Sequence, residues 1–279
     1  MKSFLSKNYF LSLIFFLCNY LQANQHIAQI SIPKCGTHLL MKCIQLLTGK
    51  TSKDTVLTWK LSDHALQNVA ASAVKLLWMH LTYDQQQARL LIKNNYIPFF
   101  IYRDPRDQII SYIFFYQKIY RVTVNMSDAI TDLITKGSLY ARPKQTRQAN
   151  RQHLTQLTNH NIYQLYNRYL PWLDHPGMLS VRFEDLVGPD GGGSLEAQLY
   201  TIQAIADHLK LENCSDEKIM FVADELFGKG APVSTISTTF RSGQIGEWKE
   251  YFTPEHKQLF KEIAGQMLID LGYETDMNW

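Results

Sequence analysis

Short apolar runs alternate with helical patterns along almost the whole chain, and this alternation limits the fold more than any other feature of the sequence. The apolar runs are rich in β-branched and aromatic residues and are short, so they predict strands rather than helices. They cover residues 26–32, 76–80, 96–102 and 178–183. Strands separated by helices pair in parallel, with helices on both faces of the sheet. The sequence therefore predicts an α/β three-layer sandwich around a mostly parallel sheet.

Helical spacing of apolar residues occurs between and after these strands. The predicted helices cover residues 39–47, 84–94, 107–120, 162–173, 195–209, 216–227 and 254–271. The glycine-rich stretch 188–194 predicts a surface loop or an insertion between a strand and a helix. No internal repeat or second boundary interrupts the pattern, so residues 24–279 are expected to form a single domain.

The first 23 residues are expected to lie apart from that domain. Lys2 and Lys7 precede an uncharged apolar run over residues 9–21, and the small residue Ala23 follows it. A basic start, a short apolar core and a small residue are typical of a secretory signal peptide. The run is shorter than the ~20 residues that a membrane-spanning helix needs. A segment that anchors the protein at a membrane, or a hydrophobic helix packed on the domain, are the alternatives.

Composition and charge exclude several classes of protein. Apolar residues make up 46% of the chain, which is a globular composition and not a disordered one. The 28 basic and 25 acidic residues give a net charge of +3, so the balance indicates no nucleic-acid partner. The four cysteines have no CxxC or Cys/His spacing, so neither a disulfide framework nor a zinc site is indicated, and no metal is expected.

The turn after the first predicted strand is suited to binding an anion. Gly36 allows the backbone to turn sharply, and the amides of residues 35–39 can then point at one anion. The start of the next helix adds partial positive charge, and Lys34 adds a full one. The pattern is not GxxxxGK[ST], because the lysine precedes the glycine. Taken alone, the turn also fits an ordinary strand-to-helix connection with a surface lysine.

Four segments, in the same order, resemble the cytosolic-type sulfotransferases, which transfer a sulfuryl group from 3′-phosphoadenosine 5′-phosphosulfate (PAPS). Residues 32–38 (IPKCGTH) resemble the family's YPKSGTTW loop, and residues 102–111 (YRDPRDQIIS) resemble its strand ending in RNPKDxxVS. Residues 240–252 (FRSGQIGEWKEYF) resemble FxRKGxxGDWKxxF, and residues 76–81 (LLWMHL) lie where the family has its catalytic histidine. The resemblance covers residues 27–272 and implies a PAPS-dependent sulfotransferase with a P-loop-containing fold.

The resemblance implies a chemical role for two residues. Sulfuryl transfer is an in-line displacement, in which the acceptor hydroxyl loses a proton and negative charge builds on the departing oxygen. His80 is implied to be the general base, because a neutral imidazole titrates near working pH. Lys34 is implied to neutralise the charge on the departing oxygen. Without the resemblance, the same residues fit a structural histidine and a solvated lysine.

The resemblance also implies a set of residues that bind the donor. Arginine forks and a serine hydroxyl match phosphate oxygens, so Arg103, Ser111 and Arg241 are implied to hold the 3′-phosphate. Phe183 and Phe227 are implied to lie beside the adenine. The full set is Lys34, Cys35, Gly36, Thr37, His38, Leu39, Arg103, Ser111, Phe183, Phe227, Arg241, Ser242 and Gly243.

Several positions in this set depart from the family pattern. Cys35 replaces a serine, His38 and Leu39 replace a threonine and a tryptophan, and Ser242 replaces a lysine. Without the indole we expect weaker stacking on the adenine, and without the lysine one positive charge is missing. Cys35 is expected to be a reactive thiol, because Lys34 and a helix N-terminus both favour the thiolate.

The acceptor is expected to be a small-molecule or glycan hydroxyl. Aromatic residues near the family-like segments predict an apolar pocket for it. They are Trp78, Phe114, Phe115, Tyr116 and Tyr120. Two other classes remain open, a P-loop kinase or NTPase and a non-catalytic nucleotide-binding or interaction protein on the same fold. The missing GK[ST] magnesium ligand argues against a kinase or NTPase. The presence of His80 together with Lys34, Arg103, Ser111 and Arg241 argues against a non-catalytic protein.

Overall fold

The computed structural model describes residues 26–57, 76–137, 139, 160–212, 214–227 and 241–279. Its centre is a five-stranded sheet in the order β2-β3-β1-β4-β5, and each neighbouring pair is parallel. The strands are β1 (His26–Ser31), β2 (Thr55–Leu57), β3 (Leu76–Met79), β4 (Tyr96–Tyr102) and β5 (Leu179–Arg182). The signal-like or anchoring segment predicted for residues 1–23 lies outside the described residues. Within the described part, no helix combines the length and apolarity that crossing a membrane requires.

Most of the longer helices begin at a side chain that caps the first turn. Asp84, Asn125, Ser194 and Ser215 each accept a hydrogen bond from an amide two to three residues into the helix. The helices are α2 (Thr37–Thr48), α4 (Gln85–Lys93), α5 (Pro105–Tyr120), α6 (Met126–Lys136), α8 (Ile162–Asn167), α9 (Phe183–Leu186), α10 (Leu195–His208), α11 (Asp216–Leu226), α12 (Trp248–Tyr251) and α13 (Pro254–Asp270). The described residues also include the short 3₁₀ turns η1 (Ser52–Asp54), η3 (Leu170–Trp172) and η4 (Pro189–Gly191).

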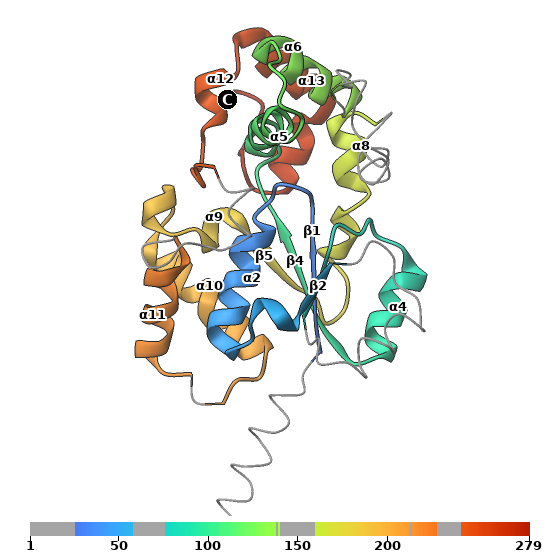
Figure 1. Cartoon of the computed structure of the whole chain (residues 1–279). Coiled ribbons are helices and arrows are strands. Elements are labelled where there is room, and N and C mark those ends of the chain that lie inside the picture. Colours follow the sequence, from blue (N-terminus) through green and yellow to red (C-terminus); the bar gives the residue numbers. More distant parts are fainter. Residues whose placement is uncertain (1–25, 58–75, 138, 140–159, 213, 228–240) are drawn as a thin grey trace, which may run out of the picture.

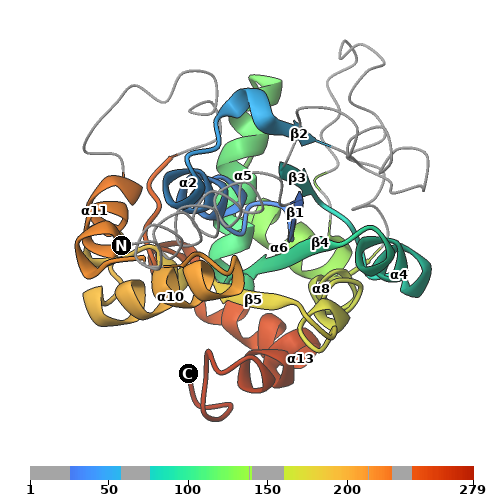
Figure 2. The same cartoon turned by 90° about the horizontal axis from the view of Figure 1, so that it is seen from below.

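Successive side chains of the strands point to opposite faces of the sheet, and each face has its own layer of helices. Ile27 and Phe99 belong to the core formed with α2, α10 and α11. Ile30 and Phe100 belong to the core formed with α4, α5, α6, α8 and α13. Figures 1 and 2 show α2, α10 and α11 on one side of the sheet and α4 and α8 on the other. The predicted three-layer α/β sandwich is confirmed.

The helix predicted over residues 162–173 is interrupted. Helix α8 ends at Asn167, and the chain continues into the 3₁₀ turn η3 around Pro171. A proline supplies no amide hydrogen and disfavours the helical conformation of the residue before it, which accounts for the break.

The glycine-rich stretch 188–194 lies between strand β5 with its short helix α9 and helix α10, and it is exposed at Pro189, Asp190, Gly192 and Ser194. Gly188 has a φ of +74°, and a Cβ there would lie 2.3 Å from the side chain of Gln198. Gly191 is buried, and its carbonyl oxygen accepts a hydrogen bond of 2.9 Å from the amide of Ile245. The stretch therefore supports the segment that contains the predicted residues Arg241 to Gly243.

The carboxyl ends of β1, β3 and β4 lie side by side at one edge of the sheet. Ile30 pairs with Met79, and Ser31 pairs with Ile101. Strand β1 has β3 on one side and β4 on the other, so the connections after β1 and after β3 run in opposite directions across the sheet. This edge is therefore a topological switch point. Ligands of open parallel sheets bind at such points. The turn after β1, His80 after β3 and Arg103 after β4 consequently meet there.

Candidate active site

The turn between β1 and α2 requires glycine at position 36. Its φ is +96°, and a Cβ there would lie 2.6 Å from the ring of Phe183 and 3.1 Å from Cδ1 of Ile101. Lys34 also has a positive φ, of 72°. This tight turn brings the start of α2 to the carboxyl end of β1. The amides of the first helical turn have no acceptor within the helix, so Thr37, His38 and Leu39 can offer theirs to an anion.

Cys35 lies in this loop, but its thiol points into the core. Its side chain is fully buried, with Sγ 3.6 Å from the hydroxyl of Tyr166, and its amide donates to the carbonyl of Ile32. Burial raises the pKa of the thiol to about 12. The prediction of a reactive thiolate is wrong, because the loss of water outweighs the nearby positive charges.

Three cations from other segments, Arg103, Arg241 and Lys118, act on the charge of Lys34 in the loop. Burial first, and then the charges of Arg103, Arg241 and Lys118, lower the pKa of Lys34 to about 8. The Nζ atom of Lys34 lies 4.4 Å from the centroid of the Phe115 ring. Like charges brought together at a partly buried place repel one another, and a bound anion removes that repulsion. The arrangement has the charge that a multiply charged anion would need, and Asp107 and Glu247 offset part of it.

Arg103 is the most deeply buried of these cations, with 5% of its surface exposed. Its Nη2 donates to the carbonyl of Gln244 at 2.5 Å, and its guanidinium lies 4.2 Å from the centroid of the Phe183 ring. The Nε atom is buried without a hydrogen-bond partner among the described residues. A buried donor of this kind is suited to a ligand oxygen.

Asp107 is a functional residue to which the sequence reasoning gave no role. Its carboxylate accepts hydrogen bonds from the amides of Gly246 at 2.7 Å and Trp248 at 2.9 Å, and it lies 3.4 Å from Nη2 of Arg103. Asp107 thereby holds segment 241–248 against the start of α5. An acid four residues after Arg103, at the start of a predicted helix, was the signal available in the sequence.

The predicted residues Arg241, Ser242 and Gly243 do reach the site. The guanidinium of Arg241 lies 4.2 Å from the centroid of the Phe114 ring and pairs through both terminal nitrogens with the carboxylate of Glu247. Ser242 Oγ also donates to that carboxylate, at 3.0 Å. Gly243 has a φ of +68°, and its carbonyl oxygen lies close to Gly191. Arg241 and Ser242 are therefore already arranged around an anionic group, here one of the chain's own.

His80 stands opposite Ser31, one residue beyond the last pair of the β1–β3 register. Its Nδ1 is 3.0 Å from the carbonyl oxygen of Ser31 and 3.0 Å from Ser31 Oγ. A carbonyl oxygen only accepts, so Nδ1 carries the proton and donates it. In the neutral ring, Nε2 then holds the lone pair that a general base needs. Trp78 meets the imidazole edge-on, with ring centroids 6.0 Å apart.

His38 contacts Trp78, the residue that also meets His80. Its ring centroid is 5.6 Å from that of Trp78, and its buried Nδ1 has no hydrogen-bond partner among the described residues. Burial, together with the charge of Lys34, lowers the pKa of His38 to about 4, so the ring is neutral at pH 7. Leu39 instead packs against the core shared by α2, α10 and α11.

The remaining predicted residues differ in how close to the cations they lie. Ser111 is on α5 and shares one helical face with Phe114, Phe115 and Lys118, by spacings of three and four residues. Phe183, expected to end a strand, begins α9 and packs between the loop glycine and Arg103. Phe227 ends α11, which packs against α2, and its adenine contact stays a prediction.

The aromatic residues predicted for the acceptor separate into two groups. Trp78, Phe114 and Phe115 are half-buried beside the histidines and cations. Tyr116 is buried in the core, and its ring centroid lies 4.7 Å from that of Tyr120. Only the first group borders the site.

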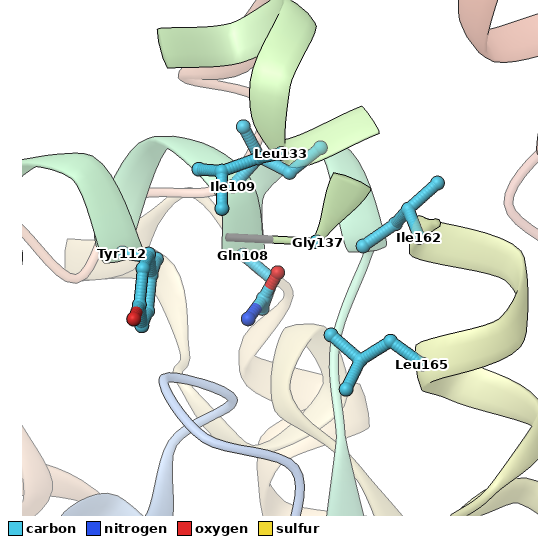
Figure 3. A pocket seen from close by; sticks show the side chains of 7 residues that line it. All are labelled: Gln108, Ile109, Tyr112, Leu133, Gly137, Ile162 and Leu165. Atoms are coloured by element: carbon cyan, nitrogen blue, oxygen red, sulfur yellow. The ribbon is translucent and has the colours of Figure 1, made fainter. Parts of the chain in front are cut away.

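A small, mainly apolar pocket lies behind the loop (Figure 3). It is lined by Gln108, Ile109, Tyr112, Leu133, Gly137, Ile162 and Leu165, from α5, from α6 and its C-cap, and from α8. Figure 3 shows the side chain of Gln108 at its centre, and the Nε2 of Gln108 donates to the carbonyl of Pro33 at 3.0 Å. The pocket therefore adjoins the loop from the side of α6 and α8. Among the described residues, no group of three or more His, Cys, Asp and Glu side chains could hold a metal ion.

Comparison with known proteins agrees with this geometry. The chain is similar in structure to mouse sulfotransferase SULT7A1 complexed with PAP, with a TM-score of 0.63 and 17% identity over 90% of this chain and 87% of that one. It is also similar to retinol dehydratase in complex with androsterone and the inactive cofactor PAP, with a TM-score of 0.57 and 15% identity over 88% and 81% of the two chains. A search of curated proteins found no match. The family model for the sulfotransferase domain matches residues 24–272, and the chain therefore belongs to the sulfotransferase-domain family.

Proposed function

We propose that this protein transfers a sulfuryl group from PAPS to a hydroxyl acceptor, within a single domain over residues 24–279. The observation that carries the proposal is the convergence of Lys34, Arg103 and Arg241 beside a loop whose neighbouring strand ends in His80. Two similar structures hold PAP, the nucleotide that remains after PAPS loses its sulfuryl group, which supports the choice of donor.

The residues fit a nucleotide with phosphates at both ends of its ribose. The loop amides and Lys34 would hold the 5′-phosphosulfate, and Arg103, Ser111 and Arg241 would hold the 3′-phosphate. The unpartnered Nε of Arg103 supports this assignment, because a phosphate oxygen would satisfy it. Glu247 must then share Arg241 with the phosphate or give way to it.

In the proposed reaction, the acceptor oxygen forms a bond to sulfur while the bond from sulfur to the 5′-phosphate oxygen breaks. Nε2 of His80 takes the proton of the acceptor hydroxyl, since Nδ1 keeps its own proton on the Ser31 carbonyl. The electron pair of the broken bond stays on the phosphate oxygen, where the ammonium of Lys34 stabilises the negative charge. PAP and the sulfated acceptor are the products.

The acceptor is proposed to be a small molecule that carries its hydroxyl on an apolar body. The half-buried rings of Trp78, Phe114 and Phe115 supply the apolar surface near the reacting groups. The retinol dehydratase structure contains androsterone, a molecule of this class, which supports the proposal.

Thermal unfolding with different nucleotides tests the donor. PAP at ~100 times its dissociation constant should stabilise the folded protein by ~2.7 kcal/mol. ATP with Mg²⁺ at the same concentration should give a clearly smaller shift. An equal or larger shift with ATP and Mg²⁺ would favour the kinase or NTPase alternative. A screen of hydroxyl acceptors with labelled PAPS then separates transfer from nucleotide binding alone.

Arg103→Ala is expected to weaken binding of PAP sharply, because it removes a charge-assisted contact worth ~1.5–3 kcal/mol per hydrogen bond. Binding of the analogue without the 3′-phosphate should barely change. Isothermal titration with both ligands measures the difference, and Arg89→Ala, at an exposed arginine of α4, is the matched control. Equal losses for both ligands would mean that Arg103 acts on the fold and not on the 3′-phosphate.

A further inference from the structure

A chain of buried polar groups connects His80 with the first turn of α2. Ser31 Oγ lies 3.0 Å from Nδ1 of His80 and 2.8 Å from Oγ1 of Thr37. The side chain of Gln29 donates to the carbonyl of Thr37 at 2.5 Å. Gln29 and Ser31 are completely buried, and Thr37 is 6% exposed. Each of these three side chains makes at least one hydrogen bond, as buried polar groups usually do.

The carbonyl of Ser31 bears directly on where the ring proton of His80 sits. Because that carbonyl can only accept, the ring proton of His80 is on Nδ1, which points at both oxygens of Ser31. Ser31 Oγ can then accept from the imidazole and donate its own proton to Oγ1 of Thr37, which lies 2.8 Å away. With the protons in this direction, the hydroxyl proton of Thr37 is turned away from Ser31. Thr37 is the first residue of α2. Its hydroxyl proton is therefore directed outward from the start of this helix, where the loop amides also lie.

We propose that Ser31 is a positioning residue for sulfuryl transfer: it holds the imidazole of His80 with its lone pair on Nε2, and it directs the hydroxyl of Thr37 toward the donor's 5′-phosphosulfate. The inference rests on the proposed role of His80 as base. When Nε2 takes the acceptor's proton, the imidazolium remains bonded to two oxygens of Ser31. A hydrogen bond to a charged ring is stronger than one to a neutral ring, so Ser31 Oγ contributes more in the transition state than before it.

The sheet offers a matched control for removal of the Ser31 hydroxyl. Ser180 lies on β5, and its buried Oγ has no hydrogen-bond partner among the described residues. Ser31→Ala and Ser180→Ala therefore remove the same atom from the same sheet, and only the first interrupts a proton-directing chain. Ser31→Thr keeps the hydroxyl and adds a methyl group that suits a strand.

Ser31→Ala is expected to lower kcat about tenfold or more, the scale of one hydrogen bond to a group that becomes charged. The KM for the donor should change much less, and Ser180→Ala should keep the wild-type kcat. Ser31→Thr should restore most of the lost rate. In the His80→Ala background, Ser31→Ala should cost little more, because a residue that acts through His80 has nothing left to position. An equal loss of kcat in both backgrounds would overturn the proposal.

Nitrogen-15 NMR of the wild-type protein with PAP provides a second, independent test. The proposal requires the neutral His80 ring to be protonated at Nδ1 and not at Nε2. The opposite tautomer would overturn it, whatever the kinetics show. The proposed role of His80 as base and the proposed role of Ser31 as positioning residue can be disproved separately. Near-normal turnover of His80→Ala removes the proposed base, whereas a large loss there with wild-type kcat in Ser31→Ala removes only the role of Ser31.

Discussion

Lys34→Met is expected to lower the turnover number by ~10²-fold or more, the scale for losing one donor that stabilises developing charge in a site shielded from water. Methionine keeps most of the volume of the stem over Phe115 and removes the charge. In the proposed reaction the ammonium meets the departing oxygen as its charge develops, so Lys34 should stabilise the transition state more than the bound donor. The affinity for the donor should therefore fall less than the turnover, since Arg103, Arg241 and the loop amides remain.

The pH dependence of the same variant gives a second measurement. The pKa of Lys34 is about 8, so the fraction of charged ammonium in the free enzyme falls as the pH rises through that value. The kcat/KM for the donor reports ionisations of the free enzyme, and it should decline above about pH 8 in the wild type. Lys34→Met should lack this decline.

Lys53→Met is the matched control for Lys34→Met. Lys53 is exposed on η1, just before the amino end of β2, whereas the site lies at the carboxyl ends of the strands. Its kinetic constants should equal those of the wild type. If Lys34→Met weakened donor binding strongly and left turnover at saturating donor intact, Lys34 would be a docking charge alone.

His80→Ala should lower turnover by ~10²-fold or more, the usual contribution of a general base. The affinity for PAP should change little, because the cations and the loop that are proposed to bind it lie on other segments. Assays with labelled donor, quenched at fixed times, measure the residual turnover of the variant. Titration with PAP measures its affinity for the nucleotide. A variant with near-normal turnover would remove His80 from the mechanism. A large loss of PAP affinity would mean that the substitution disturbs the loop through Ser31.

The sequence predicts the sheet well where apolar runs are long enough to be distinctive. The strands β1 and β4 and the helices between them match the expected ranges within two residues, because burial on both faces leaves an apolar run in the sequence. The strand β2 has only three residues, Thr55–Leu57, and was missed. Helix α6 was also missed, although the Asn125 cap and the apolar spacing within it were visible.

Side-chain directions at the site were much harder to predict than the positions of the segments. A family-like motif located Cys35 in the loop, but only the fold shows that its thiol points at Tyr166. The same holds for Glu247, whose pairing with Arg241 depends on how segment 241–248 folds back on itself. Ser31 was read only as the end of a strand, because its partner His80 is 49 residues away.

The hydrogen bonds that Asp107 accepts from two distant amides determine when, during synthesis of the chain, the proposed donor site can be completed. Gly246 and Trp248 lie 139 and 141 residues after Asp107 in the chain, and their contacts with it place Arg241 and the Gln244 carbonyl beside Arg103. A chain that is still being synthesised can form β1, β3 and β4 long before that segment leaves the ribosome. Such a chain has the loop and His80 but only part of the cation cluster. The full set of proposed donor contacts would therefore exist only after residues 241–248 have been synthesised, and a protein truncated before residue 241 would lack Arg241 and the two amides that Asp107 holds.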